Sequence, residues 1–127
     1  VTQVTAALQP RITEFAAAWP LTAAYIRSVN PDVELHVNTV YNPFFRRTAL
    51  SNLVYPFVDS VNAVITAAAV NPSSAYEVID VYSMFYRYGN RKKPAVWGLS
   101  SPTALHPTTC GYRFMCNMNK DALSETD

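Results

Sequence analysis

The segment Leu105–Tyr112 places one histidine directly before a predicted helix start. Pro107 has a fixed φ and no backbone N–H, so it stiffens the turn around His106. Thr108 or Thr109 can cap the helix that follows. Imidazole changes charge near neutral pH, and a histidine held in this way can present its ring to a neighbouring element. His106 is therefore the candidate general base of this chain.

A general base needs a nucleophile, and the sequence offers none in a recognisable setting. A Gly-x-Ser-x-Gly elbow is absent, and none of Gly89, Gly98 and Gly111 precedes a serine as such a motif requires. The second histidine, His36, lies inside a predicted strand, where a core or edge role is expected. His106 therefore has no recognisable nucleophile to serve within this sequence.

Composition narrows the functional classes. The formal net charge of +1 over 127 residues gives no electrostatic case for nucleic acid as a partner. No apolar run approaches the ~20 residues that span a bilayer, so no membrane span is expected. No Cys/His spacing for zinc and no acidic loop for calcium occurs, so we expect neither a metal nor another cofactor.

Cys110 and Cys116, roughly 9 Å apart on one helix, cannot pair with each other. They are either small core residues, or one of them pairs with another chain.

Hydrophobic periodicity and turn residues predict the elements that position His106. Pro10 and Pro20 predict breaks or kinks in the first, Ala-rich helical region. We expect one domain over 1–127, with a helical region over 1–30, a strand over 33–41, a helix over 49–70, a strand over 75–82, a loop over 83–107 and a helix over 108–123.

This order of elements predicts an α/β fold with a crossover between parallel strands. Two strands are too few for a parallel sheet that is covered on both faces. We therefore expect another chain or segment, most simply an upstream part of the same precursor, to complete the sheet. Because ligands bind outside the carboxyl ends of parallel strands, Asn42, Phe44 and Phe45 are candidates for a substrate pocket. The alternative for them is a turn whose aromatic rings cover the core.

Three segments resemble the SGNH (GDSL-type) lipases and esterases. Residues 30–44 resemble a late strand of that family with its exit turn, and residues 79–85 resemble the last strand. Leu105-His106-Pro107 with Gly111-Tyr112 resembles the catalytic-histidine block, which usually reads Asp-x-x-His-Pro. The resemblance covers nearly the whole chain, but only the C-terminal half of the family pattern.

The resemblance implies the C-terminal part of a flavodoxin-like three-layer α/β/α sandwich, with His106 as the catalytic base. The family's Gly-Asp-Ser and Gly-x-Asn-Asp motifs are absent here. They would lie on an N-terminal segment of the same precursor, held beside this one as a heterodimer in a secreted enzyme. Thr103 stands where the family has aspartate. Either Thr103 or a backbone carbonyl of residues 101–103 would then orient the imidazole.

These observations lead to a functional hypothesis. The chain supplies the catalytic histidine of a serine ester hydrolase that acts on lipid or acylated-sugar esters. One alternative is a non-catalytic interaction subunit with a degenerate SGNH-like fold. Another is a self-contained small α/β binding domain.

Two further features of the sequence have more than one interpretation. The aromatic residues Phe85, Tyr86 and Tyr88 could wall a groove or simply pack, and the basic runs 46–47 and 91–93 are most often only solvated in such loops.

Overall fold

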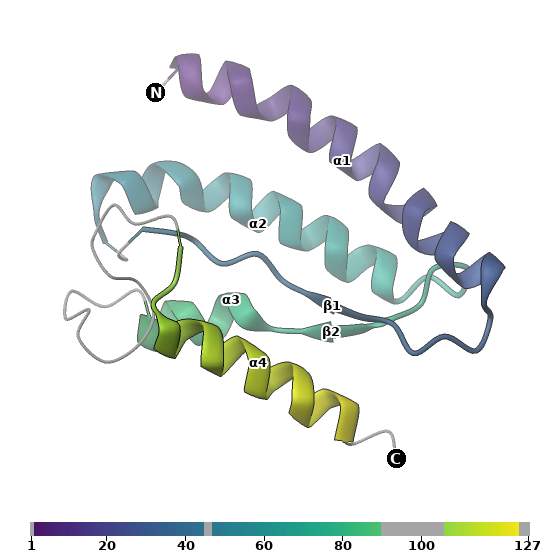
Figure 1. The fold of residues 1–127 in the computed structure, drawn as a ribbon. Helices are drawn as coiled ribbons and strands as arrows, with labels where there is room; N and C mark the ends of the chain where they lie inside the picture. Colours follow the sequence, from purple (N-terminus) through teal and green to yellow (C-terminus); the bar gives the residue numbers. More distant parts are fainter. Residues whose placement is uncertain (1, 45–46, 90–105, 125–127) are drawn as a thin grey trace. The chain divides into compact units, whose positions relative to one another are not determined.

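The computed structural model describes residues 2–44, 47–89 and 106–124 (Figure 1). Helices account for 70% of these residues, and two short parallel strands form a two-stranded sheet. The elements in chain order are α1 (Thr2–Val29), β1 (His36–Asn38), α2 (Ala49–Ala69), β2 (Glu77–Ile79), α3 (Val81–Met84), a turn of π-helix η1 (Phe85–Gly89) and α4 (Thr109–Ser124).

The predicted flavodoxin-like three-layer α/β/α sandwich is wrong, because the described residues are dominated by helices. Each predicted strand keeps only three residues in β structure. The second strand ends where Asp80 caps α3, since its side chain accepts a bond from the Ser83 N–H. Helical structure from Val81 to Gly89 therefore replaces the start of the loop predicted over 83–107. A pair of three-residue strands cannot form the wide sheet that such a sandwich requires.

Proline does not interrupt the two long helices. Helix α1 runs through Pro10 and Pro20, where breaks or kinks were expected, and α2 runs through Pro56. A proline inside a helix removes one backbone hydrogen bond and costs roughly 3 kcal/mol, so other interactions must offset this loss. The expected regions 1–30 and 49–70 are observed as Thr2–Val29 and Ala49–Ala69.

The chain divides into two compact units. The first comprises residues 1–37 and 56–78, and the second comprises residues 38–55 and 79–127. The division passes through α2 and through both strands. Each unit has its own buried residues.

In the first unit, the apolar face of α1 that the periodicity predicts is shielded from solvent. Ala23 on this face is fully buried. The Trp19 indole N–H donates to the Tyr76 hydroxyl at 2.8 Å, and that hydroxyl donates to the backbone carbonyl of Ile65. Phe15 stacks on Trp19 with ring centroids 5.9 Å apart. Two hydrogen bonds and a ring contact thus connect α1, α2 and the segment before β2.

We expect Tyr76 to make stability depend on pH in the alkaline range. Burial raises the pKa of the Tyr76 phenol above its ordinary value of 10.0, while the bond from Trp19 opposes that change. As pH rises past that value, the unfolded chain loses its phenol proton before the folded chain does. The stabilisation from Tyr76 is therefore fully present below pH 10.0 and is lost as pH rises through the folded-state pKa.

Urea unfolding at a series of pH values from about 9 to about 12 measures this dependence. Tyr76→Phe should make the decline shallower. Burial also raises the pKa of Tyr41 in the second unit. In the double variant Tyr41→Phe, Tyr76→Phe, the decline of stability with rising pH should therefore be shallower still. A decline equally steep in both variants and the wild type would contradict the assignment.

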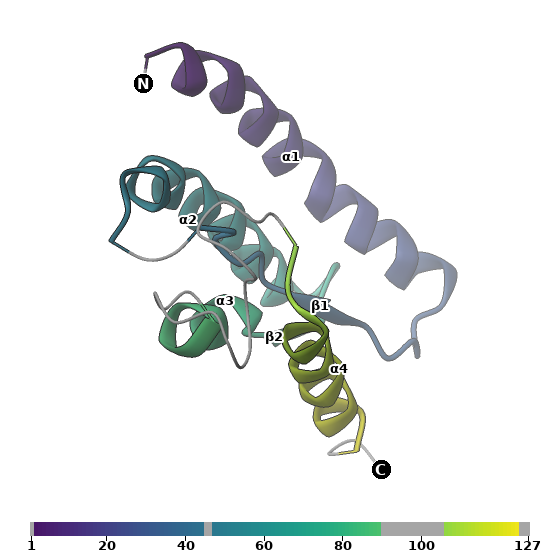
Figure 2. The ribbon, with the colours of Figure 1, turned by 60° about the vertical axis from the view of Figure 1, so that its left-hand side comes forward.

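The second unit is built around an apolar cluster that draws on β2, α3, η1 and α4. Ile79, Val81, Phe85 and Ala122 form its buried apolar cluster, with Tyr41, Met115 and Met118 packed against them. Figure 2 shows α3 beside α4, and the shared cluster explains this placement. The Tyr41 and Phe85 rings stack with centroids 4.4 Å apart. These contacts hold the middle and end of α4 beside the segments that follow β1 and β2.

Candidate functional site

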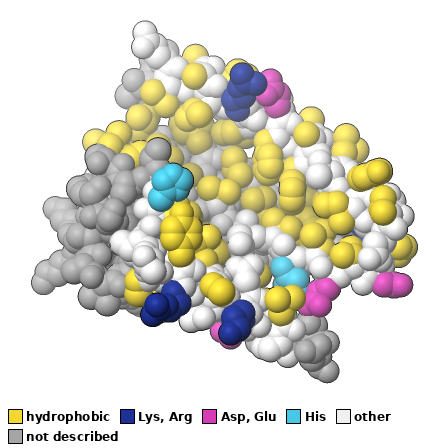
Figure 3. All heavy atoms as spheres, in the orientation of Figure 1, with side chains coloured by type: hydrophobic (Ala, Val, Ile, Leu, Met, Phe, Trp, Pro, Cys, Tyr) yellow, Lys and Arg dark blue, Asp and Glu magenta, His cyan; other side chains and the backbone are white. Residues whose placement is uncertain are grey.

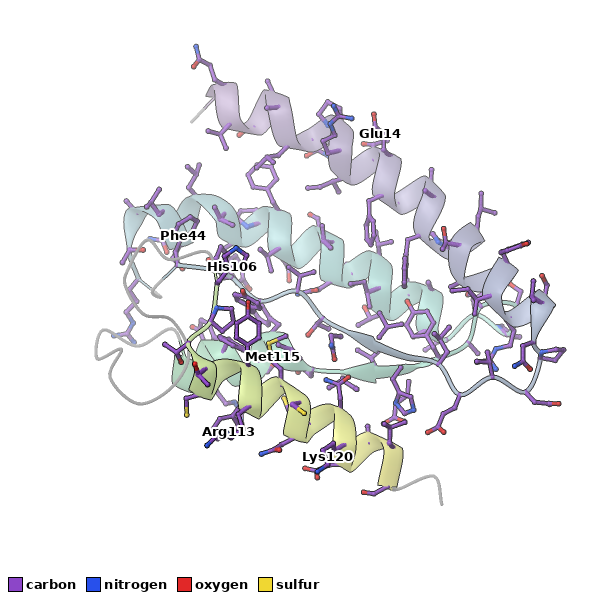
Figure 4. All side chains as sticks on the ribbon, in the orientation of Figure 1. Glu14, Phe44, His106, Arg113, Met115 and Lys120 are labelled. Atoms are coloured by element: carbon purple, nitrogen blue, oxygen red, sulfur yellow. The ribbon has the colours of Figure 1, made fainter. Side chains whose placement is uncertain are left out.

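His106 is exposed and lies on the short segment that leads into α4 (Figure 4). The next residue, Pro107, is buried. The Thr108 hydroxyl accepts a bond from the Gly111 N–H at 3.1 Å, and its carbonyl accepts one from the Tyr112 N–H at 3.0 Å. Thr108 is thus the N-cap of α4. A buried proline and a capped helix start fix the backbone on the C-terminal side of His106.

The first turn of α4 lies near the carboxyl end of β1. Tyr41 follows β1, and burial raises the pKa of its phenol. The neighbouring Tyr112 phenol raises that pKa further. Tyr112 belongs to the first turn of α4, and Met115, three residues further along α4, packs on the same apolar cluster as Tyr41. Figure 4 shows His106 and Phe44 at the same end of the second unit.

The other histidine has a different environment. The His36 side chain is only 10% exposed, and its Nε2 lies 2.7 Å from a Glu34 carboxylate oxygen. Its Nδ1 lies 3.4 Å from a Glu77 carboxylate oxygen. His36 therefore joins β1 to β2 within the first unit, as the prediction of a core or edge role anticipated. Within the described part of the chain, His106 has no hydrogen bond to another residue. Figure 3 shows the histidine side chains in cyan.

Asn42 is a buried residue that holds the turn after β1. Its side-chain amide donates to the Ser51 carbonyl at 3.1 Å and lies 3.2 Å from the Ser51 hydroxyl. Its amide oxygen accepts a bond from the Phe44 N–H at 3.0 Å. Asn42 thus attaches the turn to the start of α2. Phe44 is half-buried beside it. The two remaining candidates, Phe45 and Thr103, lie outside the described residues.

A pocket of about 430 Å³ opens in the second unit close to this turn. Its lining combines aromatic rings with polar groups and consists of Arg47, Ser51, Asn52, Tyr55, Tyr82 and Tyr86. Tyr86 belonged to the aromatic cluster noted in the sequence, and Arg47 belonged to a short basic run. Nothing in the sequence indicated that Tyr55 and Tyr82 would join them, because the residues come from separate segments of the chain.

In comparisons with known proteins, no family model, curated protein or solved structure matches this chain. Among the described helices, none is long and apolar enough to cross a membrane. No group of three or more His, Cys, Asp or Glu side chains in residues 2–44, 47–89 and 106–124 is placed to hold a metal ion. Cys110 and Cys116 both lie on α4 and are unpaired, and Cys116 is exposed.

Proposed function

We propose that this chain supplies the general base of a serine ester hydrolase, as the likeness of residues 105–112 to a catalytic-histidine block suggests. The observation that carries the proposal is the setting of His106. Its side chain is exposed, while Pro107 and the capped start of α4 hold the backbone that follows it. A base must reach the proton of its nucleophile with little reorganisation, and an exposed side chain on a held backbone supports this proposal.

The proposed reaction is acyl transfer to water. A serine hydroxyl attacks the ester carbonyl while the His106 imidazole takes the hydroxyl proton. The tetrahedral intermediate then expels the alcohol, which takes that proton from the imidazolium. Water repeats both steps on the acyl-serine, releases the carboxylic acid and restores the serine. Hydrogen-bond donors facing the carbonyl oxygen stabilise the developing negative charge.

The nucleophile and these donors would come from a companion segment, since the sequence contains no Gly-Asp-Ser motif. An apolar stripe on α1 supports the existence of such a companion. Leu21, Tyr25 and Val29 recur every fourth residue and therefore share one helix face. They are 71%, 70% and 67% exposed. Figure 3 shows apolar side chains at the surface along α1. Aligned apolar side chains of this size are typical of surfaces that bind another protein segment.

The complete product of the gene that encodes this chain provides the test. We expect it to hydrolyse p-nitrophenyl butyrate and to react with a fluorophosphonate at one serine. Peptide mapping should place that serine outside residues 1–127. Labelling at a serine within these residues would overturn the proposed division of the site. Absence of both hydrolysis and labelling would favour a non-catalytic interaction subunit.

A further inference from the structure

Three tyrosines form an aromatic corner in the pocket of the second unit. The Tyr82 and Tyr86 rings, one helical turn apart, are nearly parallel, with centroids 6.1 Å apart and an interplanar angle of 18°. The Tyr55 ring is tilted by 53° against Tyr82, with centroids 6.4 Å apart. The three rings together give the pocket an aromatic surface against which a planar ligand ring can pack. Aromatic rings favour offset-stacked and edge-to-face arrangements of this kind.

The charge of the lining favours an anion. Arg47 is the cationic side chain, and none of the lining residues that the structure describes is acidic. A guanidinium group can form two parallel hydrogen bonds to one carboxylate. Ser51 and Asn52 belong to the first turn of α2, whose dipole adds partial positive charge at the same place. The pocket therefore presents positive potential beside its aromatic corner.

The polar and aromatic groups of the lining indicate which kind of anionic ligand, a sugar acid or an aromatic acid, fits the pocket. Apart from the phenols and Arg47, the lining residues that the structure describes offer one hydroxyl and one amide side chain. A sugar acid carries several hydroxyls, and each of them needs a partner when it is buried. An aromatic acid needs polar partners only at its carboxylate. The volume of about 430 Å³ lies in the range of small-molecule sites.

From this combination we infer that the pocket binds an aromatic carboxylate, with the ring against Tyr82 and Tyr86 and the carboxylate at Arg47. The inference goes beyond the proposed hydrolase activity, because binding of the free acid needs neither His106 nor a companion serine. It can therefore fail or succeed independently of that proposal.

Isothermal titration of the complete gene product with 2-naphthoate tests the inference. We expect binding in the micromolar to millimolar range. Removing the carboxylate charge (2-naphthalenemethanol) or the aromatic character (cyclohexanecarboxylate) should weaken binding by about 3- to 10-fold each. Tighter binding of glucuronate than of 2-naphthoate would overturn the proposed ligand class. Failure of 2-naphthoate to bind at all would overturn the site.

Variants of the lining locate the binding within the protein. Arg47 has a φ of 65°, a left-handed conformation that asparagine tolerates better than most residues. Arg47→Asn therefore removes the charge without adding strain, and should weaken 2-naphthoate binding by about 3- to 10-fold. Tyr86→Leu should have an effect of similar size, whereas Tyr86→Phe keeps the ring and should retain binding.

A matched control comes from α1, in the first unit. Arg11→Asn removes the same type of group as Arg47→Asn from an exposed position. It should bind 2-naphthoate like the wild type. Binding that survives Arg47→Asn and Tyr86→Leu unchanged would place the ligand elsewhere and contradict the inference. Circular dichroism of each variant verifies that it is folded.

Discussion

Replacing His106 by alanine is expected to lower kcat for p-nitrophenyl butyrate by about 10²–10⁴-fold in the complete gene product, the range typical of a lost general base. In the proposed reaction, loss of the imidazole leaves the companion serine without a group that takes its proton and the leaving alcohol without a proton donor. Because His106 is exposed, the substitution creates no buried cavity, and the folded structure should persist. Steady-state kinetics with thermal unfolding of the same samples separates chemistry from stability.

His36 is the matched control, since the chain contains two histidines and only one is proposed to act chemically. His36→Gln removes the contacts with Glu34 and Glu77. It should lower the unfolding temperature and leave kcat within about 3-fold of the wild type. Full activity in His106→Ala would remove the histidine from the mechanism. Equal loss of kcat in both variants, with both still folded, would mean that neither ring has a specific role.

Replacing Arg27 by methionine is expected to destabilise the protein by about 2–4 kcal/mol, the largest stability effect of any single change considered. One guanidinium nitrogen of Arg27 donates to the carbonyls of Pro31 at 2.9 Å and Val33 at 2.6 Å. The other donates to the carbonyl of Ala75. Arg27 thus ties the end of α1 to the chain before β1 and to the chain before β2. Methionine keeps the apolar stem of the side chain and removes all three bonds.

Urea unfolding measures this effect, and α1 itself provides the control. Arg11 pairs with Glu14 at the exposed surface of α1. Because exposed ion pairs contribute little, Arg11→Met should change the free energy of unfolding by no more than about 0.5 kcal/mol. Arg27→Lys keeps the charge but loses the forked geometry, so it should lie between the wild type and Arg27→Met. Equal effects of Arg11→Met and Arg27→Met would show that the bonds to the three carbonyls contribute nothing specific.

The helices were predictable because their signals are local. Apolar residues on one face of α1 recur every three or four positions, and the face they define is the one that is shielded. The turn before α4 was readable for the same reason, since Pro107 and Thr108 act on their immediate neighbours. Local pattern did not reveal that α1 would continue through Pro10 and Pro20. Tertiary contacts such as the bond between Trp19 and Tyr76 help to offset the proline cost.

The strands were the least predictable elements. β-branched residues over 33–41 and 75–82 indicated long strands, yet only His36–Asn38 and Glu77–Ile79 pair. A strand extends only as far as its partner follows it, so its length is a property of the pair. After Ile79 the chain turns into α3, where the Thr39 hydroxyl accepts a bond from the Tyr82 N–H at 2.9 Å. This bond joins residues far apart in the sequence.

The amino-acid sequence alone therefore determined where the long helices lie and that one histidine precedes a capped helix start, because both depend on neighbours within about one helical turn. Only the tertiary structure decided that His36 would be engaged by two carboxylates while His106 faces solvent. It also decided that Arg47 and Tyr55 would meet Tyr82 and Tyr86 around one pocket. Residues from separate segments come together only when the folded chain repays the entropy of closing the loops between them.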